Sequence, residues 1–154
     1  MRSWGAALTA LFFLAGCSGW MVSNKDEGAK ELERSFKDSE SHVKENRTRS
    51  ALGALETAVG DYVKAEGRIP EDLSALIPKY LAEIPSVDLD VPRHQETNAV
   101  KIYPSSILRD GLIDGTKLAD TGKWGYVHNE RQVVVFVDCT HPSSRGRPWY
   151  QERP

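Results

Sequence analysis

The fold of this chain is decided by residues 51–66, whose sequence reads ALGALETAVGDYVKAE. The large apolar residues of this stretch recur at steps of three and four: Leu52, Leu55, Val59, Tyr62 and Val63. That period places them on one face of an amphipathic helix, wide enough to pack on a sheet. Gly67 is expected to end the helix as its C′ residue, and Pro70 prevents the helix from continuing.

The same helix is predicted to begin at Ala29, because no proline interrupts the chain from there to Glu66. Its first half, residues 29–50, is dense in charge, and opposite charges often stand four residues apart, as in Glu45 and Arg49. Each such pair adds roughly 0.2–0.5 kcal/mol to the stability of a helix. We therefore expect an exposed, solvated helix over residues 29–50 rather than a coiled-coil seam.

Downstream, short apolar segments predict a small sheet. Residues 100–103 alternate like a strand, and the segments 124–128 and 132–137 are strand candidates separated by a short turn. The latter two should form an antiparallel hairpin, whereas residues 86–99 are polar, without a clear period, and indicate a loop. The predicted fold class is α+β, with a long N-terminal helix packed on a small antiparallel sheet, and the globular part spans residues 51–151.

The amino-terminal residues carry a targeting signal. Arg2 precedes an apolar run over residues 6–14 that is too short to cross a bilayer comfortably, and the small-residue site Ala15-Gly16-Cys17 follows it. This layout resembles the lipobox of bacterial lipoproteins, in which cleavage precedes the cysteine and the cysteine carries the acyl chains. An ordinary signal peptide with an incidental cysteine is the alternative.

The lipobox sets the expected domain organisation and location. Residues 1–16 would be removed as a signal peptide, Cys17 would be lipidated with acyl chains such as palmitate, and residues 17–28 would form a short tether. The mature chain has no other long apolar segment, so we expect it to be anchored to a membrane rather than threaded through it. The non-acidic Ser18 implies, by the same resemblance, the outer membrane and its periplasmic side.

Charge and cysteine content narrow the class of protein. The chain has 20 basic and 22 acidic residues in mixed order, so the basic surface of a nucleic-acid-binding protein is missing and no nucleic-acid partner is expected. Beside Cys17 there is one other cysteine, Cys139, which stands two residues before His141 and next to Asp138. This arrangement raises the hypothesis of a Cys/His nucleophile pair, but a buried structural cysteine is the favoured interpretation. No zinc-ligand spacing joins the four histidines, at positions 42, 94, 128 and 141.

Aspartates gather in the later part of the chain. A glycine-containing loop over residues 109–122 holds Asp110, Asp114 and Asp120, and Asp138 follows the predicted hairpin. Hard oxygen ligands on a flexible loop suit calcium, so Asp114, Asp120 and Asp138 are candidate calcium ligands. Aspartates that only hydrogen-bond within turns are the favoured interpretation, and no cofactor is expected.

Five short segments follow one another in a characteristic order: AVGDYVKAEGRIP at 58–70, PKYLAEIP at 78–85, GKWGY at 122–126, VFVDC at 135–139 and GRPWY at 146–150. Their order and spacing resemble the type IV pilin and type II secretion pseudopilin family, especially the major pseudopilins, over residues 29–151. The resemblance implies a pilin-like fold and calcium in the late loops. Family members begin with a prepilin-peptidase site and an apolar helix, whereas the lipobox and charged helix of this chain imply a protein that does not polymerise.

These features predict a non-catalytic structural or interaction role in the cell envelope, which the resemblance links to a type II secretion or type IV pilus system. The expected partners are the membrane, through the lipid, and envelope secretion or pilus proteins; no catalytic residue and no small-molecule substrate is evident. A periplasmic binding module or a small hydrolase on a reused pilin-like fold is the alternative, since function resides in sites rather than in folds. Four aromatic residues are expected in the core, with an exposed partner-binding patch as the alternative: Trp124, Tyr126, Trp149 and Tyr150.

Overall fold

The computed structural model describes the backbone of residues 20–154 and the side chains of residues 26–154. The expected signal peptide and the lipidation site Cys17 lie outside the described residues. The chain divides into two compact units, residues 1–36 and residues 37–154, and the boundary between them falls inside the first helix. We call residues 37–154 the head.

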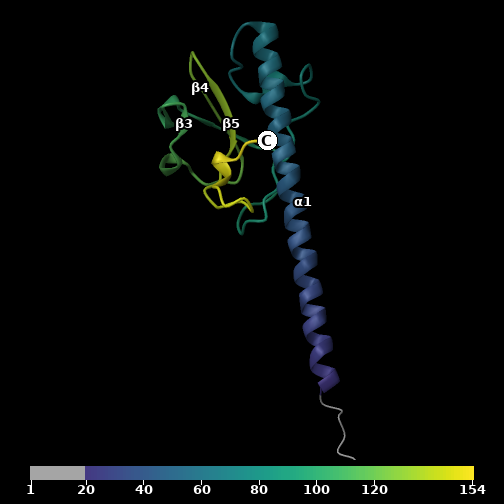
Figure 1. The fold of residues 1–154 in the computed structure, drawn as a ribbon. Helices are drawn as coiled ribbons and strands as arrows, with labels where there is room; N and C mark the ends of the chain where they lie inside the picture. Colours follow the sequence, from purple (N-terminus) through teal and green to yellow (C-terminus); the bar gives the residue numbers. More distant parts are fainter. Residues whose placement is uncertain (1–19) are drawn as a thin grey trace, which may run out of the picture. The chain divides into compact units, whose positions relative to one another are not determined.

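Helix α1 (Trp20–Glu66) is the only α-helix of the described residues (Figure 1). It begins earlier than expected, so residues 20–28 of the predicted tether are helical. Its end confirms the prediction, because Gly67 has a φ of 67° and its N–H donates to the carbonyl oxygen of Val63 at 2.9 Å. Within residues 20–154, no helix has both the length and the apolar character needed to cross a membrane.

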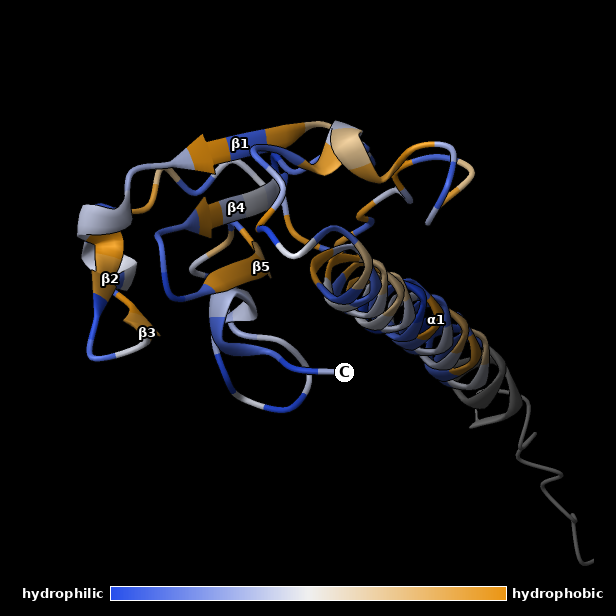
Figure 2. Ribbon diagram, turned by 90° about the horizontal axis from the view of Figure 1, so that it is seen from above, coloured by the Kyte–Doolittle hydropathy of each residue, from blue (hydrophilic) through white to orange (hydrophobic). Residues whose placement is uncertain are grey.

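Three strands lie side by side in the main sheet, in the order β1 (Val100–Tyr103), β4 (Trp124–His128) and β5 (Val133–Val137) (Figure 2). β4 and β5 pair antiparallel, which confirms the predicted hairpin. β1 pairs with β4 in parallel, so the prediction of an antiparallel sheet is wrong and the sheet is mixed. The connection explains this difference, because residues 104–123 cross over from the end of β1 to the beginning of β4, as a parallel pair requires.

The crossover contains a second, two-stranded antiparallel sheet, β2 (Leu108–Arg109) with β3 (Leu112–Ile113). Residues 86–99 form the expected loop, although Val87 and Thr97 pair across it in an isolated bridge and Val87 is buried. Short 3₁₀ helices complete the head, at Leu73–Leu76, Ser105–Ile107, Gly115–Lys117 and Trp149–Gln151.

The second half of α1 packs on one face of the main sheet. The predicted apolar face of the helix, from Leu52 to Tyr62, is buried against alternate residues of β4 and β5: Trp124, Tyr126, Val135 and Val137. The residues between them, Val127 and Phe136, point to the opposite face and pack with residues of the crossover. Both faces of the sheet are therefore covered at β4 and β5. Of the four aromatic residues in question, three are core residues and Tyr150 is half-buried, which confirms the favoured interpretation.

Packing against Phe136 explains why a glycine, Gly125, stands between the two aromatic residues of β4. It is the cross-strand partner of Phe136 in the β4–β5 register, and a Cβ atom at this position would collide with the Phe136 ring. The absence of a side chain lets the ring lie against the backbone of the neighbouring strand.

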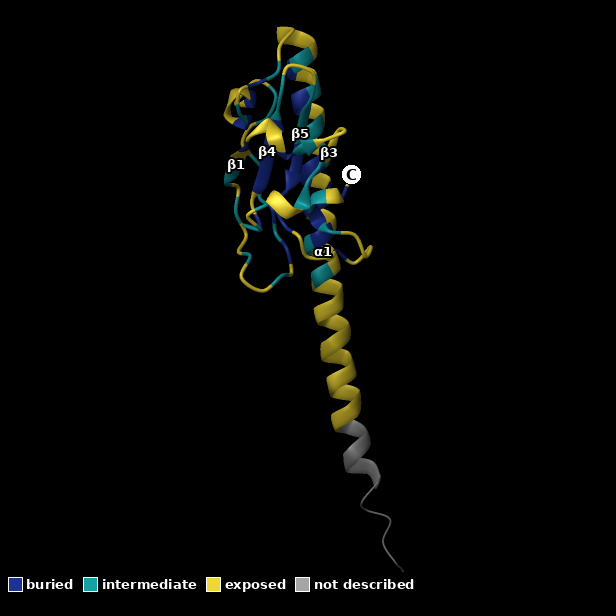
Figure 3. Ribbon diagram, turned by 90° about the vertical axis from the view of Figure 1, so that its left-hand side faces the viewer, coloured by how far each residue is buried: buried dark blue, intermediate teal, exposed yellow. Residues whose placement is uncertain are grey.

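A buried ion network joins α1 to the C-terminal segment. Arg49 lies between two carboxylates, because its Nη2 donates to Glu45 Oε2 at 2.9 Å and its Nε donates to Glu152 Oε2 at 3.3 Å. The side chains of Arg49, Glu45 and Glu152 are only 7%, 9% and 2% exposed. The expected exposed helix is confirmed over residues 29–40, but it does not extend to residue 50, since burial begins at Glu45 (Figure 3).

Hydrogen bonds from the C-terminal segment allow these charges to be buried. Ser144 donates its backbone N–H, at 2.9 Å, and its hydroxyl to Glu45, and the Ser143 hydroxyl donates to Glu152 Oε1 at 2.5 Å. Burial by itself would raise the pKa of Glu45, but the bonds from Ser144 and Arg49 outweigh it and hold this pKa below its usual range. Glu45 and Arg49, which the sequence predicts to form an ion pair on the exposed surface of the helix, are therefore buried in the interior.

Candidate metal centre

Four side chains from three distant segments meet at one end of the main sheet. His94 lies in the loop before β1, Asp120 lies in the crossover before β4, and Cys139 and His141 follow β5. One ligand atom from each residue takes part, and these four atoms all lie within 4.8 Å of one another. We call these residues the four-residue cluster. Sequence spacing missed it because the fold, not the local sequence, brings His94 and His141 together.

Asp138 and Gly122 position two members of the cluster. The buried Asp138 carboxylate accepts the backbone N–H of Asp120 at 3.3 Å, and it accepts both the N–H and the hydroxyl of Thr121, at 3.2 and 2.5 Å. These bonds hold the crossover loop against the end of β5. Gly122 has a φ of 69°, and a Cβ atom there would lie 2.6 Å from Cγ of His94, so only glycine lets the imidazole approach this closely.

The nitrogen–oxygen distances within the four-residue cluster are longer than direct hydrogen bonds between charged groups, whereas Cys139 and His141 lie at an ordinary hydrogen-bond distance for sulfur. His94 Nε2 lies 3.6 Å from Asp120 Oδ1, and His141 Nδ1 lies 3.5 Å from Asp120 Oδ2 and 3.5 Å from Cys139 Sγ. A direct bond between an imidazolium and a carboxylate would bring nitrogen and oxygen to about 2.7–2.9 Å. Asp120 Oδ1 accepts the backbone N–H of Thr140 at 2.7 Å, which fixes the orientation of the carboxylate.

His94 is the member with an unmet hydrogen-bonding requirement. Its side chain is 6% exposed, and its Nε2 is the one buried side-chain nitrogen or oxygen without a hydrogen-bond partner among residues 26–154. A buried polar atom left in this state costs about 1–3 kcal/mol. His141 is 46% exposed, and an open cavity lined by His94, Asp120 and His141 gives the cluster access to solvent.

The environment of Cys139 bears on the hypothesis of a Cys/His nucleophile pair. The cysteine is completely buried, and burial raises the pKa of its thiol to about 12, with the neighbouring carboxylate of Asp120 acting in the same direction. A thiol with this pKa is neutral at physiological pH, whereas nucleophilic cysteines have lowered pKa values and partial exposure. The geometry therefore favours a buried structural cysteine over a nucleophile.

The three candidate calcium ligands make different contacts in the described structure, although the Asp138 carboxylate accepts the backbone N–H of Asp120. Asp114 caps the 3₁₀ helix Gly115–Lys117, accepting the N–H and hydroxyl of Thr116 at 3.2 and 2.6 Å, and these bonds hold its pKa below the usual range. Asp138 holds the crossover loop, and only Asp120 belongs to the four-residue cluster. Calcium binding by these aspartates remains a prediction.

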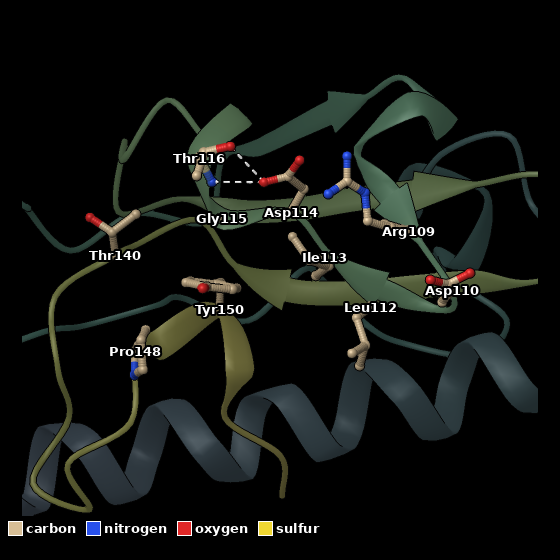
Figure 4. A pocket seen from close by; sticks show the side chains of 10 residues that line it. All are labelled: Arg109, Asp110, Leu112, Ile113, Asp114, Gly115, Thr116, Thr140, Pro148 and Tyr150. Carbon is tan, nitrogen blue, oxygen red and sulfur yellow. Dashed lines mark hydrogen bonds between the residues drawn. The ribbon is translucent and has the colours of Figure 1, made fainter.

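A second open cavity lies over β2 and β3, lined by Arg109, Asp114 and the ring of Tyr150 among others (Figure 4). The Asp114 carboxylate is turned toward Thr116, and the Arg109 side chain lies next to it. Electrostatic attraction by Arg109 also lowers the pKa of Asp114. The Asp114 carboxylate of this wall thus has hydrogen-bond partners, whereas Nε2 of His94 in the four-residue cluster has none.

Comparisons of the chain with models of protein families, with characterised proteins and with solved structures found no match. The resemblance to pilins and pseudopilins therefore rests on the sequence segments alone.

Proposed function

We propose that this chain is a bacterial lipoprotein, held by acyl chains on Cys17 at the periplasmic side of the outer membrane, with a non-catalytic structural or interaction role in the envelope. The observation that carries the proposal is the difference between the two halves of α1. All residues from 26 to 40 are exposed, and the exposed positions include large apolar side chains such as Leu32 and Phe36. Such a charged, exposed helix is suited to connect a lipid anchor to the head, and it is unsuited to the bilayer interior.

The roles of the buried ionisable groups support a non-catalytic function. Glu45 and Glu152 are held by Arg49, Asp138 holds the crossover loop, and Cys139 is completely buried. Each of these groups is engaged in packing or in hydrogen bonds that maintain the fold. Catalytic acids, bases and nucleophiles, by contrast, need a pKa matched to their task and access to a substrate.

A pilin-like architecture of the head is the finer part of the proposal. It is supported by the order of elements, by the packing of the second half of α1 on the main sheet, and by the β4–β5 hairpin. The link to a type II secretion or type IV pilus system rests on this likeness and on the sequence segments that resemble the family. The parallel β1–β4 pair is a feature for which the sequence resemblance gave no indication.

Lipidation is tested by replacing Cys17. Cells grown with radiolabelled palmitate should incorporate label into the chain without substitutions and into Cys139→Ser, but not into Cys17→Ser. The reason is that only Cys17 stands at the lipobox. When residues 1–17 are also exchanged for an ordinary cleavable secretory signal, the protein should move from the membrane to the soluble periplasmic fraction. Label in Cys17→Ser, or continued membrane association of the exchanged chain after a high-salt wash, would contradict the anchor.

Filament formation distinguishes this proposal from a true pilin. Residues 29–50 are too rich in charge for the apolar bundle of a filament core, where each unpaired charge would cost several kcal/mol. Cells that overproduce the protein should therefore show no filaments that carry an antibody against it, by immunogold labelling and negative-stain microscopy. Labelled filaments would restore the pilin interpretation.

A further inference from the structure

We propose that His94, Asp120, Cys139 and His141 bind one Zn²⁺ ion in a closed tetrahedral site that fastens three segments of the head together. This site goes beyond the proposed anchoring and interaction role.

The distances between the ligand atoms fit a tetrahedral zinc centre. With zinc bonds of about 2.0–2.2 Å to nitrogen or oxygen and about 2.3 Å to sulfur, the edges of the tetrahedron measure about 3.3–3.6 Å. With Asp120 Oδ2 as the ligand atom, two such edges are observed: His141 Nδ1 lies 3.5 Å from Asp120 Oδ2 and 3.5 Å from Cys139 Sγ. His94 Nε2 lies 3.6 Å from the other carboxylate oxygen, Oδ1, and one ligand atom from each of the four residues lies within 4.8 Å of the others. The two nitrogen–oxygen separations are longer than strong charge-assisted hydrogen bonds, and one shared ion would draw the four atoms together to the edges of the tetrahedron.

The buried Nε2 of His94 is the second, independent observation. It lies within the cluster, without a hydrogen-bond partner, on a side chain that is 94% buried. Gly122, through its positive φ and missing side chain, leaves the space that the imidazole occupies. A metal ion at the centre of the cluster would accept the Nε2 lone pair and remove the unmet requirement, which no described residue does.

The donor set selects zinc over calcium or magnesium. Imidazole nitrogen and thiolate sulfur are preferred by zinc, whereas calcium and magnesium need shells of hard oxygen ligands. On coordination the Cys139 thiol would release its proton to solvent, so one thiolate and one carboxylate would balance the charge of Zn²⁺. The Thr140 N–H already bonds to Asp120 Oδ1 and would act as an outer-shell bond, so Oδ2, which lies 3.5 Å from His141 Nδ1, is the oxygen left for the metal.

The expected consequence of the site is structural. Four protein ligands complete a tetrahedral shell and leave no position for a reactive water, as in structural rather than catalytic zinc sites. The ligands would link the loop before β1, the crossover before β4 and the segment after β5. The half-exposed His141 and the cavity beside it provide a route by which the ion enters.

The test uses the full chain carrying Cys17→Ser, purified in mild detergent, so that Cys139 is the only thiol. Titration with Zn²⁺ against a chromophoric chelator should show one ion per chain. Replacement of Zn²⁺ by Co²⁺ should give a thiolate-to-cobalt charge-transfer band together with the intense visible bands of tetrahedral cobalt. His141→Gln should weaken Zn²⁺ binding by at least about 100-fold, more than the loss of an outer-shell partner does, and Cys139→Ser should abolish the charge-transfer band.

The matched control is His42→Gln, which replaces an exposed histidine of α1 outside the cluster and should bind Zn²⁺ like the parent. In the presence of a chelator, His141→Gln and the parent should melt at the same temperature, because His141 is half-exposed and its loss leaves the fold intact; added Zn²⁺ should raise the melting temperature of the parent only. The proposal is overturned if Zn²⁺ does not bind in stoichiometric amount, if His141→Gln binds it as tightly as His42→Gln does, or if millimolar Ca²⁺ displaces it.

Discussion

Replacing Arg49 by methionine (Arg49→Met) is expected to lower the free energy of unfolding by about 3–5 kcal/mol. The substitution removes the buried cation that lies between Glu45 and Glu152, whose side chains are 9% and 2% exposed. The bonds from Ser144 to Glu45 and from Ser143 and Arg145 to Glu152 remain. Methionine keeps the length and apolar character of the arginine stem, so most of the loss should come from the two lost ion pairs rather than from a cavity. The loss of unfolding free energy is measured by urea unfolding of the full chain at neutral pH, monitored by circular dichroism.

Two further variants separate the charge effect from other causes. Arg47→Met makes the same chemical change at an exposed position of the same helix, and it should alter stability by no more than about 0.5 kcal/mol. Adding Glu45→Gln and Glu152→Gln to Arg49→Met removes the two carboxylate charges that lost Arg49 and should recover part of the lost stability. Equal stability of Arg49→Met and Arg47→Met would show that the buried network contributes nothing.

Replacing Leu55 by alanine (Leu55→Ala) is expected to cost about 2–5 kcal/mol, the range for a fully buried leucine. Leu55 has no exposed surface and packs in the core between α1 and the main sheet, where a smaller side chain leaves a cavity. Leu32→Ala is the matched control, because it removes the same atoms from a residue that is 58% exposed, and Lys37→Ala tests a charged position of the exposed half. Both controls should unfold like the parent.

Urea midpoints decide between the two descriptions of α1. If Leu55→Ala and Leu32→Ala lose similar stability, the helix does not divide into a docked half and an exposed half. The same measurement on Lys37→Ala shows whether the charged residues of the exposed half contribute to folding beyond the small effect of surface pairs.

The features that were predicted correctly all depend on local sequence. The apolar face of the helix follows from the spacing of residues such as Leu52, Leu55 and Val59, and its end follows from the ability of Gly67 to adopt a positive φ. The hairpin follows from two apolar segments that are separated by a short turn. In each case the deciding residues are neighbours along the chain, so the preference for a helix, a helix end or a hairpin can be predicted from the local sequence.

The candidate metal centre shows the opposite case. Cys139 and His141 could be recognised as a local pair, and Asp120 was grouped with Asp114 and Asp138 as a candidate calcium ligand, but no sequence signal joined Asp120 to Cys139 and His141. His94 carried no signal at all, because the crossover and the end of β5 bring the other ligands to it. Gly122 could not be recognised from the sequence as part of the site, because its role, to allow the close approach of the His94 imidazole, depends on the folded structure.

The sequence by itself determined the amphipathic half of α1, its C-terminal end and the β4–β5 hairpin, because these depend on periodicity and turn geometry within a few residues. The tertiary structure decided the parallel pairing of β1, the burial of Glu45 and Arg49, and the meeting of the four-residue cluster. Each of the latter depends on residues far apart in the chain, such as Glu152 for Arg49 and Asp120 for His94. A charged or polar side chain can be buried only where such a distant partner compensates for lost solvation, and the local sequence does not show where that partner will lie.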